Sequence, residues 1–199
     1  QALMASTYPL EVVQAARWLK ANPSLKGEAA VKAVANQSWD VSVKSLVAFP
    51  QVVVMMGENP TWVKDLGDAF LLQPEDVMDS VQRLRLAAQN AGNLQSNEQV
   101  VVKVETQPPP DIVVQVNAPP PPPQVIVIEQ RNPQVVFVPM YNPVHMFGPW
   151  MWPAFPPVFI PPPVGFWWHH PISTGIWWGV GVGVTHAMWG HPHWWNRRV

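Results

Sequence analysis

The chain changes character within residues 74–105, which read PEDVMDSVQRLRLAAQNAGNLQSNEQVVVKVE. The first half is typical of a helix. Pro74 suits the first helical position, an apolar-periodic run follows, and Gly92 suits the position just beyond a helix C-terminus. From Val102 onward β-branched and charged residues alternate, which is typical of a strand. The chain is therefore predicted to pass from helices to strands near residue 98, which makes the fold class α+β.

Residues 1–98 are predicted to form an all-α helical domain. Proline precedes apolar-periodic runs at Pro9, Pro50 and Pro60 as well, and the first residues of the chain resemble the middle of a helix. Asp40 and Asn59 are expected to cap the helices that follow them. The predicted helices cover residues 9–21, 25–35, 41–49, 51–57, 61–72 and 75–90. The expected core side chains are Trp18, Trp39, Trp62, Leu66 and Phe70.

Residues 99–140 are predicted to form a segment of short strands with proline-rich spacers. Four β-branched runs, at 99–105, 111–116, 124–129 and 134–138, carry the strand signal. The five prolines at 119–123 favour a stiff polyproline II spacer. Arg131-Asn132-Pro133 separates the last two runs and is expected to form a hairpin turn between them.

Residues 141–199 are predicted to form an irregular tail rich in proline, tryptophan and glycine. From Asn132 to Asn196 there is no Asp, Glu, Lys or Arg, yet nine of the 12 tryptophans and all six histidines lie after residue 140. Glycine and valine alternate from Gly179 to Val184. On a strand this pattern places the glycines on one face, where another part of the protein can approach closely.

Composition excludes several classes of protein. A net charge of −1 gives no bulk attraction to nucleic acid. Without cysteine the chain has no disulfide, no thiolate zinc site and no covalently attached haem. No run of 18 apolar residues free of charge, proline and glycine occurs, so no ordinary transmembrane helix is expected.

Catalytic motifs are equally scarce. The densest acidic cluster, Glu75, Asp76 and Asp79, lies in the first turns of a predicted helix, where the helix dipole favours acids. There is no Gly-x-Ser-x-Gly motif and no phosphate-binding glycine loop. The chain is therefore not expected to be an enzyme, and no cofactor is expected.

The tail histidines leave a metal site open as a weaker hypothesis. His169-His170 and His191-Pro192-His193 can together supply neutral imidazoles, which suit zinc, copper or nickel. No acidic residue or cysteine lies nearby to complete such a site. The favoured interpretation is that these histidines form hydrogen bonds or stack on aromatic rings, and a non-covalent haem is the least favoured one.

The tryptophans and the glycine-valine stretch predict an interaction surface, because tryptophan is enriched in protein and membrane interfaces. We expect a self-associating structural subunit, forming a homo-oligomer or filament, because an uncharged aromatic tail must pack against something. The alternative is a membrane-associated module or a partner of another envelope protein, although the many prolines argue against spanning. The predicted interface residues are Trp150, Trp152, Trp167, Trp168, Trp177, Trp178, Val180, Val182, Trp189, Trp194 and Trp195.

Three long motifs resemble a known family. They are LMASTYPLEVVQAARWL at residues 3–19, WDVSVKSLVAFP at 39–50 and NPQVVFVPMYNP at 132–143. They resemble a family of exported Gram-negative bacterial proteins catalogued as a domain of unknown function. The resemblance implies a signal and a further helix ahead of residue 1, and a location in the periplasm, at the outer membrane or outside the cell. It assigns no catalytic residues.

Overall fold

The computed structural model describes residues 1–106, 124–160, 176–178 and 181–183, with only the backbone described at 176–178. Helices come first and short antiparallel strands follow, so the predicted α+β class is confirmed. The helices are α1 (Ala2–Ser6), α2 (Pro9–Ala21), α3 (Gly27–Ala33), α4 (Val41–Leu46), α5 (Pro50–Glu58), α6 (Pro60–Leu72), α7 (Pro74–Asn90) and α8 (Pro143–Met146). The strands are β1 (Val100–Thr106), β2 (Gln124–Gln130), β3 (Val135–Val136), β4 (Pro139–Tyr141), β5 (Ile176–Trp178) and β6 (Val182–Gly183).

Proline sets the helix starts as expected, since α2, α5, α6 and α7 all carry it in their first turn. The Asp40 side chain caps α4 by accepting a hydrogen bond from the backbone N–H of Ser42. Gly92 (φ +77°) ends α7. The N–H groups of Gly92 and Asn93 bond to the carbonyls of Gln89 and Ala88, which is the pattern of a Schellman cap.

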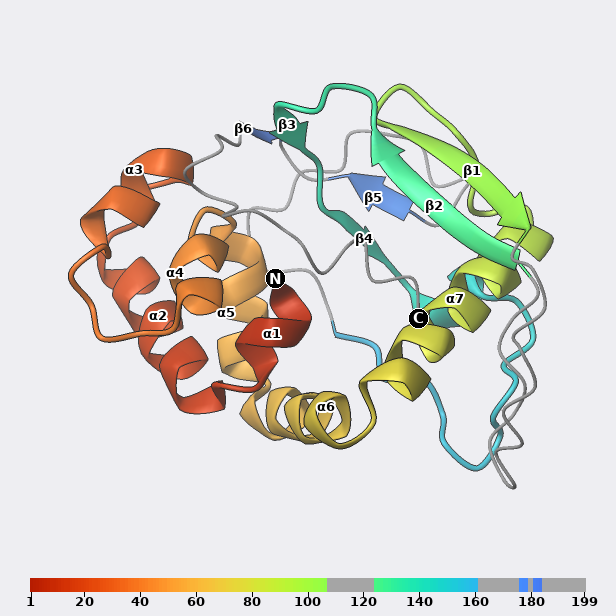
Figure 1. Ribbon diagram of the computed structural model, residues 1–199, viewed down its shortest axis with the longest axis horizontal. Helices are drawn as coiled ribbons and strands as arrows, with labels where there is room; N and C mark the ends of the chain where they lie inside the picture. The colour runs from red at the N-terminus through yellow and green to blue at the C-terminus, as the bar shows by residue number, and fades with distance from the viewer. Residues whose placement is uncertain (107–123, 161–175, 179–180, 184–199) are drawn as a thin grey trace.

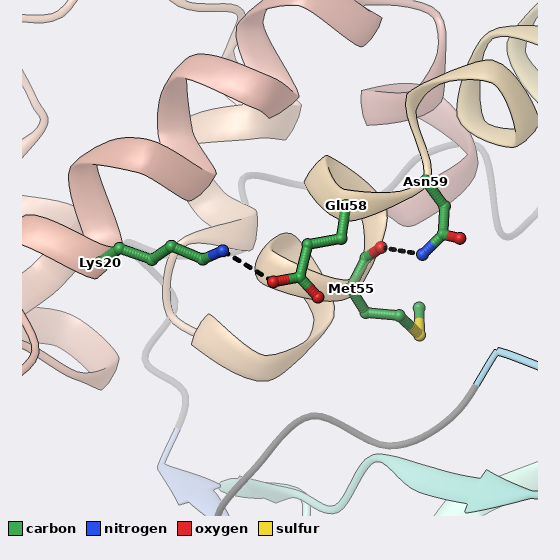
Figure 2. Close-up of polar contacts among 4 residues, drawn as sticks. All are labelled: Lys20, Met55, Glu58 and Asn59. Carbon is green, nitrogen blue, oxygen red and sulfur yellow. Dashed lines mark hydrogen bonds and ion pairs between the residues drawn. The ribbon is translucent and has the colours of Figure 1, made fainter.

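The prediction for Asn59 is confirmed for its position, since it is the N-cap residue of α6, but not for its side chain. Its side chain does not cap α6; its amide Nδ2 instead donates to the Met55 carbonyl and closes the end of α5. Figure 2 shows this bond beside the Lys20–Glu58 ion pair, which joins the C-terminal ends of α2 and α5 at 2.7 Å. Both partners of the ion pair are half exposed, so it contributes little stability.

The helical core is built mainly from small and β-branched side chains. Helix α2 packs along α5, and the two approach so closely that a Cβ added at Gly57 would lie 2.4 Å from the Cβ of Ala16. Helix α1 packs on α6 at Gly67, where an added Cβ would lie 2.2 Å from the Ser6 carbonyl oxygen. Alanine and valine therefore dominate this first cluster, which we call the helical core.

Only part of the expected aromatic core is confirmed. Trp39 is buried and its Nε1 donates to Gln14 Oε1 at 2.9 Å. Trp18 is half-buried against the helical core. The prediction for Trp62 was wrong, because its side chain is 37% exposed, and Leu66 and Phe70 are only partly buried. Helix α6 turns Val63 and Gly67 inward, which places Trp62 on the outer side.

The strands form three separate antiparallel pairs, β1–β2, β3–β6 and β4–β5 (Figure 1). The predicted hairpin across Arg131-Asn132-Pro133 was wrong. Strand β2 pairs with β1, from Val100 opposite Gln130 to Thr106 opposite Gln124, while β3 pairs with β6. The expected strand at 111–116 and the proline spacer at 119–123 lie outside the described residues.

A second hydrophobic cluster joins α7 to the β1–β2 pair. Its buried members are Ala88, Leu94, Ile126, Met146 and Phe147, so residues on both sides of position 140 share it. The helical core likewise takes in Val136, Val138 and Val182 from the strands. Residues 135–147 therefore connect the two clusters.

Candidate interaction surface

An aromatic row runs outward from the second cluster. Tyr141 meets Phe147 edge to face with ring centroids 5.5 Å apart, Phe147 lies 6.1 Å from Trp150, and Trp150 meets Trp152 edge to face at 5.4 Å. Edge-to-face contacts of this kind add stability beyond the buried area. The row anchors residues 149–160, which we call the aromatic segment, to the folded part of the chain.

Two hydrogen bonds shape the aromatic segment. The indole Nε1 of Trp150 donates to the Phe155 carbonyl at 2.7 Å, and the Phe155 N–H donates to the Trp152 carbonyl at 2.9 Å. The chain therefore turns around Pro153 and presents the side chain of Phe155 to solvent. Prolines at 149, 153, 156 and 157 hold the segment extended between such turns.

The aromatic segment exposes large apolar side chains over a stretch without charge. Met151 is 45% exposed, Phe155 77%, Val158 62% and Phe159 44%. Single exposed apolar residues are ordinary, but four within nine positions are typical of an interaction surface. The sequence prediction singled out tryptophans and missed these four residues. The signal was the spacing of Phe155, Val158 and Phe159 between prolines, which prevents them from forming a core of their own.

Helix α8 fixes the base of this surface. The Asn142 side chain accepts a hydrogen bond from the N–H of Val144 and caps the helix. From the loop after α7, Asn93 Nδ2 donates to the carbonyls of His145 and Met146, at 2.7 and 3.1 Å. Since Asn93 directly follows the Schellman glycine, the C-terminus of α7 holds α8 in place.

Two arginines of α7 lie in contrasting surroundings. Arg85 Nη1 donates to the Ile126 carbonyl at 2.9 Å, and burial lowers the pKa of this guanidinium although nearby Tyr141 opposes the shift. Burial raises the pKa of Tyr141, and Arg85 partly offsets that change. Arg83 donates through Nη2 to Ser80 Oγ at 3.0 Å, but its Nε and Nη1 are buried and have no hydrogen-bond partner in the part of the chain that the structure describes.

The structure describes some of the predicted interface residues. It brings Trp150 and Trp152 together in the aromatic row. Trp177 and Trp178 belong to β5, opposite Met140 and Pro139 of β4. Val182 of β6 is half-buried against the helical core. Outside the described residues lie Trp167, Trp168, Val180, Trp189, Trp194 and Trp195.

At one position, Gly181, the glycine-valine stretch shows the close approach that its pattern predicted. A Cβ added at Gly181 would lie 2.6 Å from Val135 Cγ1 and 2.8 Å from Phe137 Cε1. The side chains of Val135 and Phe137 therefore pack against the backbone at Gly181, where no side chain stands in the way. At Gly183, no atom of the described residues lies within 4 Å of an added Cβ.

The candidate metal ligands His169, His170, His191 and His193 all lie outside the described residues. Within the described part of the chain, no group of three or more His, Cys, Asp or Glu side chains is placed to hold a metal ion. Among the described residues the one histidine is His145, which is exposed on α8. The metal hypothesis therefore stays a prediction.

A shallow apolar groove of about 320 Å³ lies between the N-terminal ends of α2 and α6. Its walls are Pro9, Leu10, Val13, Pro60, Thr61 and Lys64. Among these side chains only Lys64 is ionisable, and it pairs with Asp68 at 2.6 Å. Asp68 is not part of the lining, so the groove itself contains no acid–base pair. Among the described helices, none is long and apolar enough to cross a membrane.

Comparison with known proteins places the chain in a family. It belongs to the family described as a protein of unknown function (DUF3300), whose model matches residues 1–199. It is 46% identical over 209 residues to the uncharacterized protein YacH of Escherichia coli strain K12, an alignment that covers 98% of this chain and 34% of that protein. The chain thus spans about a third of the length of this relative. No solved structure matches it.

Proposed function

We propose that the chain is a non-enzymatic structural or assembly subunit of the bacterial cell envelope or extracellular space, which self-associates through its charge-free aromatic surface. The observation that carries the proposal is the exposure of Met151, Phe155, Val158 and Phe159 on the aromatic segment. An apolar patch that stays in contact with water favours association, because burying it releases the hydration cost of its surface.

The free energies of burial and of association favour a surface on which several side chains are buried together. Burying one aromatic side chain stabilises a complex by roughly 2–3 kcal/mol. Association costs about 4–15 kcal/mol in lost freedom, so several side chains must engage together. Copies of the same chain supply such sets of contacts repeatedly, and prolines reduce the entropy that the segment loses on docking.

The oligomeric state of the protein tests the proposal. In the variant Phe155→Ser/Phe159→Ser we expect association to weaken while the far-ultraviolet spectrum and melting temperature stay unchanged, because both side chains are largely outside the core. A matched control is Leu10→Ser/Leu72→Ser, which removes two side chains that are 70% and 85% exposed on the helices. Sedimentation velocity over a range of concentrations measures all three proteins.

The alternative is a membrane-associated envelope module that uses the same aromatic residues at a lipid surface. If Phe155→Ser/Phe159→Ser assembles like the unaltered protein, the aromatic segment is not the self-association surface. Binding of the two proteins to anionic and zwitterionic liposomes then distinguishes the functions. Loss of liposome binding in the variant supports the membrane module.

Export is part of the proposal, on the resemblance of the three long motifs to exported proteins. Cell fractionation of the native protein tests it directly. We expect the protein in the periplasmic, outer-membrane or culture fraction, and its recovery with cytosolic markers alone would contradict the envelope assignment.

A further inference from the structure

The two-stranded sheet β1–β2 has two outer edges, and the structure covers them unequally. Along β2, Ile126 points its backbone polar groups away from β1. Its N–H donates to Gln82 Oε1 at 3.0 Å and its carbonyl accepts from Arg85 Nη1 at 2.9 Å. Helix α7 therefore closes the β2 edge at Ile126, below the strand pair in Figure 1.

The loop before β1 closes the first half of the β1 edge. Val100 exchanges hydrogen bonds with Asn97, whose Oδ1 accepts from the Val100 N–H and whose own N–H donates to the Val100 carbonyl. The Val102 N–H donates to Ser96 Oγ at 2.9 Å, while the return contact from Ser96 Oγ to the Val102 carbonyl is long, at 3.5 Å. Side chains thus substitute for a neighbouring strand as far as Val102.

Among the described residues, none covers the second half of the β1 edge. Backbone groups alternate between the two sides of a strand, so Val104 and Thr106 point outward like Val100 and Val102. Among the described residues, no group bonds to the outward N–H and carbonyl of Val104. Val104 is 46% exposed, and Glu105 and Thr106 are exposed too. An edge with free backbone groups and a β-branched residue is a template for another strand.

We infer that this edge pairs with β1 of a second copy of the chain, antiparallel about a two-fold axis at Val104. In that register the N–H and carbonyl of each Val104 bond to those of the other. The Thr106 N–H of one copy reaches the Val102 carbonyl of the other, where it replaces the long contact from Ser96. The result is a four-stranded sheet whose two outer edges are closed by α7.

Charge complementarity selects a second copy as the occupant. Lys103 and Glu105 flank Val104 on the same face of the strand. The two-fold axis places Lys103 of each copy opposite Glu105 of the other, which gives two attractive cross-strand pairs. A lysine on an edge strand usually discourages pairing. Lys103 already pairs with Glu129 of β2 at 2.6 Å, so the charge that a second copy newly compensates is that of Glu105, which forms no ion pair among the described residues. A partner strand without a lysine at that position does not compensate it.

The other face of the strand supports the same register. Val102 packs against the second cluster with Ile128, next to the buried Ile126, and the 46% exposed Val104 continues the row of Val100 and Val102 along the strand. Pairing sets the two Val104 side chains beside each other and covers that exposed row. The inference deepens the proposed self-association and rests on it, but it uses a surface distinct from the aromatic segment.

A cysteine cross-link tests the register, because the chain has no cysteine of its own. Hydrogen-bonded partners in an antiparallel pair have Cα atoms about 5.5 Å apart, which is within the range of a disulfide. Val104→Cys should therefore form a covalent dimer on treatment with the thiol oxidant diamide. Thr106→Cys is the matched control. The two Thr106 residues lie four residues apart along the strands, about 14 Å, so this variant should not form the covalent dimer.

Charge reversal tests the partner. Glu105→Lys and Lys103→Glu should each lower the self-association constant by roughly tenfold or more, because both cross-strand pairs become repulsive. A mixture of the two variants restores both attractive pairs and should form mixed dimers. Equal cross-linking of both cysteine variants, or the absence of mixed dimers, would overturn the inference. Running the tests also on Phe155→Ser/Phe159→Ser separates it from the proposed function, since β1 pairing should survive there even if larger assemblies vanish.

Discussion

The contact between α2 and α5 gives the sharpest prediction for stability. A methyl group added at Gly57 would lie 2.4 Å from the Cβ of Ala16, whereas carbon atoms rest about 3.5–4.0 Å apart. Gly57→Ala therefore forces the helices apart by more than about 1 Å. Overpacking of this kind costs about 1–3 kcal/mol, and the better helix propensity of alanine returns up to about 1 kcal/mol. We expect a net loss of about 1–2 kcal/mol.

Moving the methyl group across the interface should relieve the overlap. In Ala16→Gly/Gly57→Ala the other neighbours of the new methyl are the Val12 carbonyl oxygen at 3.6 Å and Val13 Cα at 3.7 Å, which are ordinary contacts. Ala16→Gly alone should cost about 1 kcal/mol in helix propensity, plus about 0.8 kcal/mol for the lost buried group. The double variant should be more stable than the sum of the single changes by about 1–3 kcal/mol.

Urea unfolding followed by far-ultraviolet circular dichroism measures all four proteins of this cycle. Gly57→Ala that is as stable as the unaltered chain would show that α2 and α5 do not approach as closely as the structure places them. Strict additivity of the two single changes would refute the direct contact between positions 16 and 57.

Three further predictions concern capping, buried charge and metal. Asp40→Ala should cost about 1 kcal/mol by removing the α4 cap. Burial raises the pKa of Asp40, but hydrogen bonds from Ser42, Val41 and Tyr8 outweigh it and leave the pKa below 3.8. The stability that Asp40 adds is therefore complete above about pH 4 and is lost as pH falls through the lowered pKa. Thermal melts of the unaltered chain should show this loss, and melts of Asp40→Ala should not. Arg85→Met should destabilise by about 1–3 kcal/mol because the Ile126 carbonyl loses its donor, whereas Arg83→Met should be neutral or stabilising because it removes unpaired buried groups; urea unfolding distinguishes the two signs. EDTA should leave the melting temperature unchanged, and stoichiometric zinc, copper or nickel that disappears in His191→Ala/His193→Ala would contradict this.

Local signals predicted the helices well. Proline at helix starts, Asp40 before α4 and Gly92 after α7 act through backbone groups within a few residues, so their meaning does not depend on the rest of the chain. Asn59 shows the limit of such reasoning. It stands between two helices, and its side chain can serve the end of one or the start of the next; the structure selects the Met55 carbonyl of α5.

Long-range pairing was beyond the sequence pattern. The run at 134–138 and the turn before it fit a hairpin with β2, but Val135 and Val136 pair with Gly183 and Val182 instead. That choice depends on the space that Gly181 leaves for Val135 and Phe137, and on the fit of Val182 to the helical core. The burial of Trp62 was misjudged for a related reason, since the α1–α6 contact at Gly67 decides which side of α6 turns inward.

These contacts change how the charge-free region must be probed. Truncation after Val144 removes Met146 and Phe147 from the second cluster and Val182 from the helical core. A charge at Val182 is desolvated against the same core, so Val182→Asp should lower the melting temperature even in dilute monomer. Phe155, at 77% exposed, makes no such contribution, and Phe155→Asp should leave the melting temperature unchanged. Only a variant such as Phe155→Asp can separate loss of association from loss of folding, because the replaced side chain lies at the surface and contributes nothing to the core.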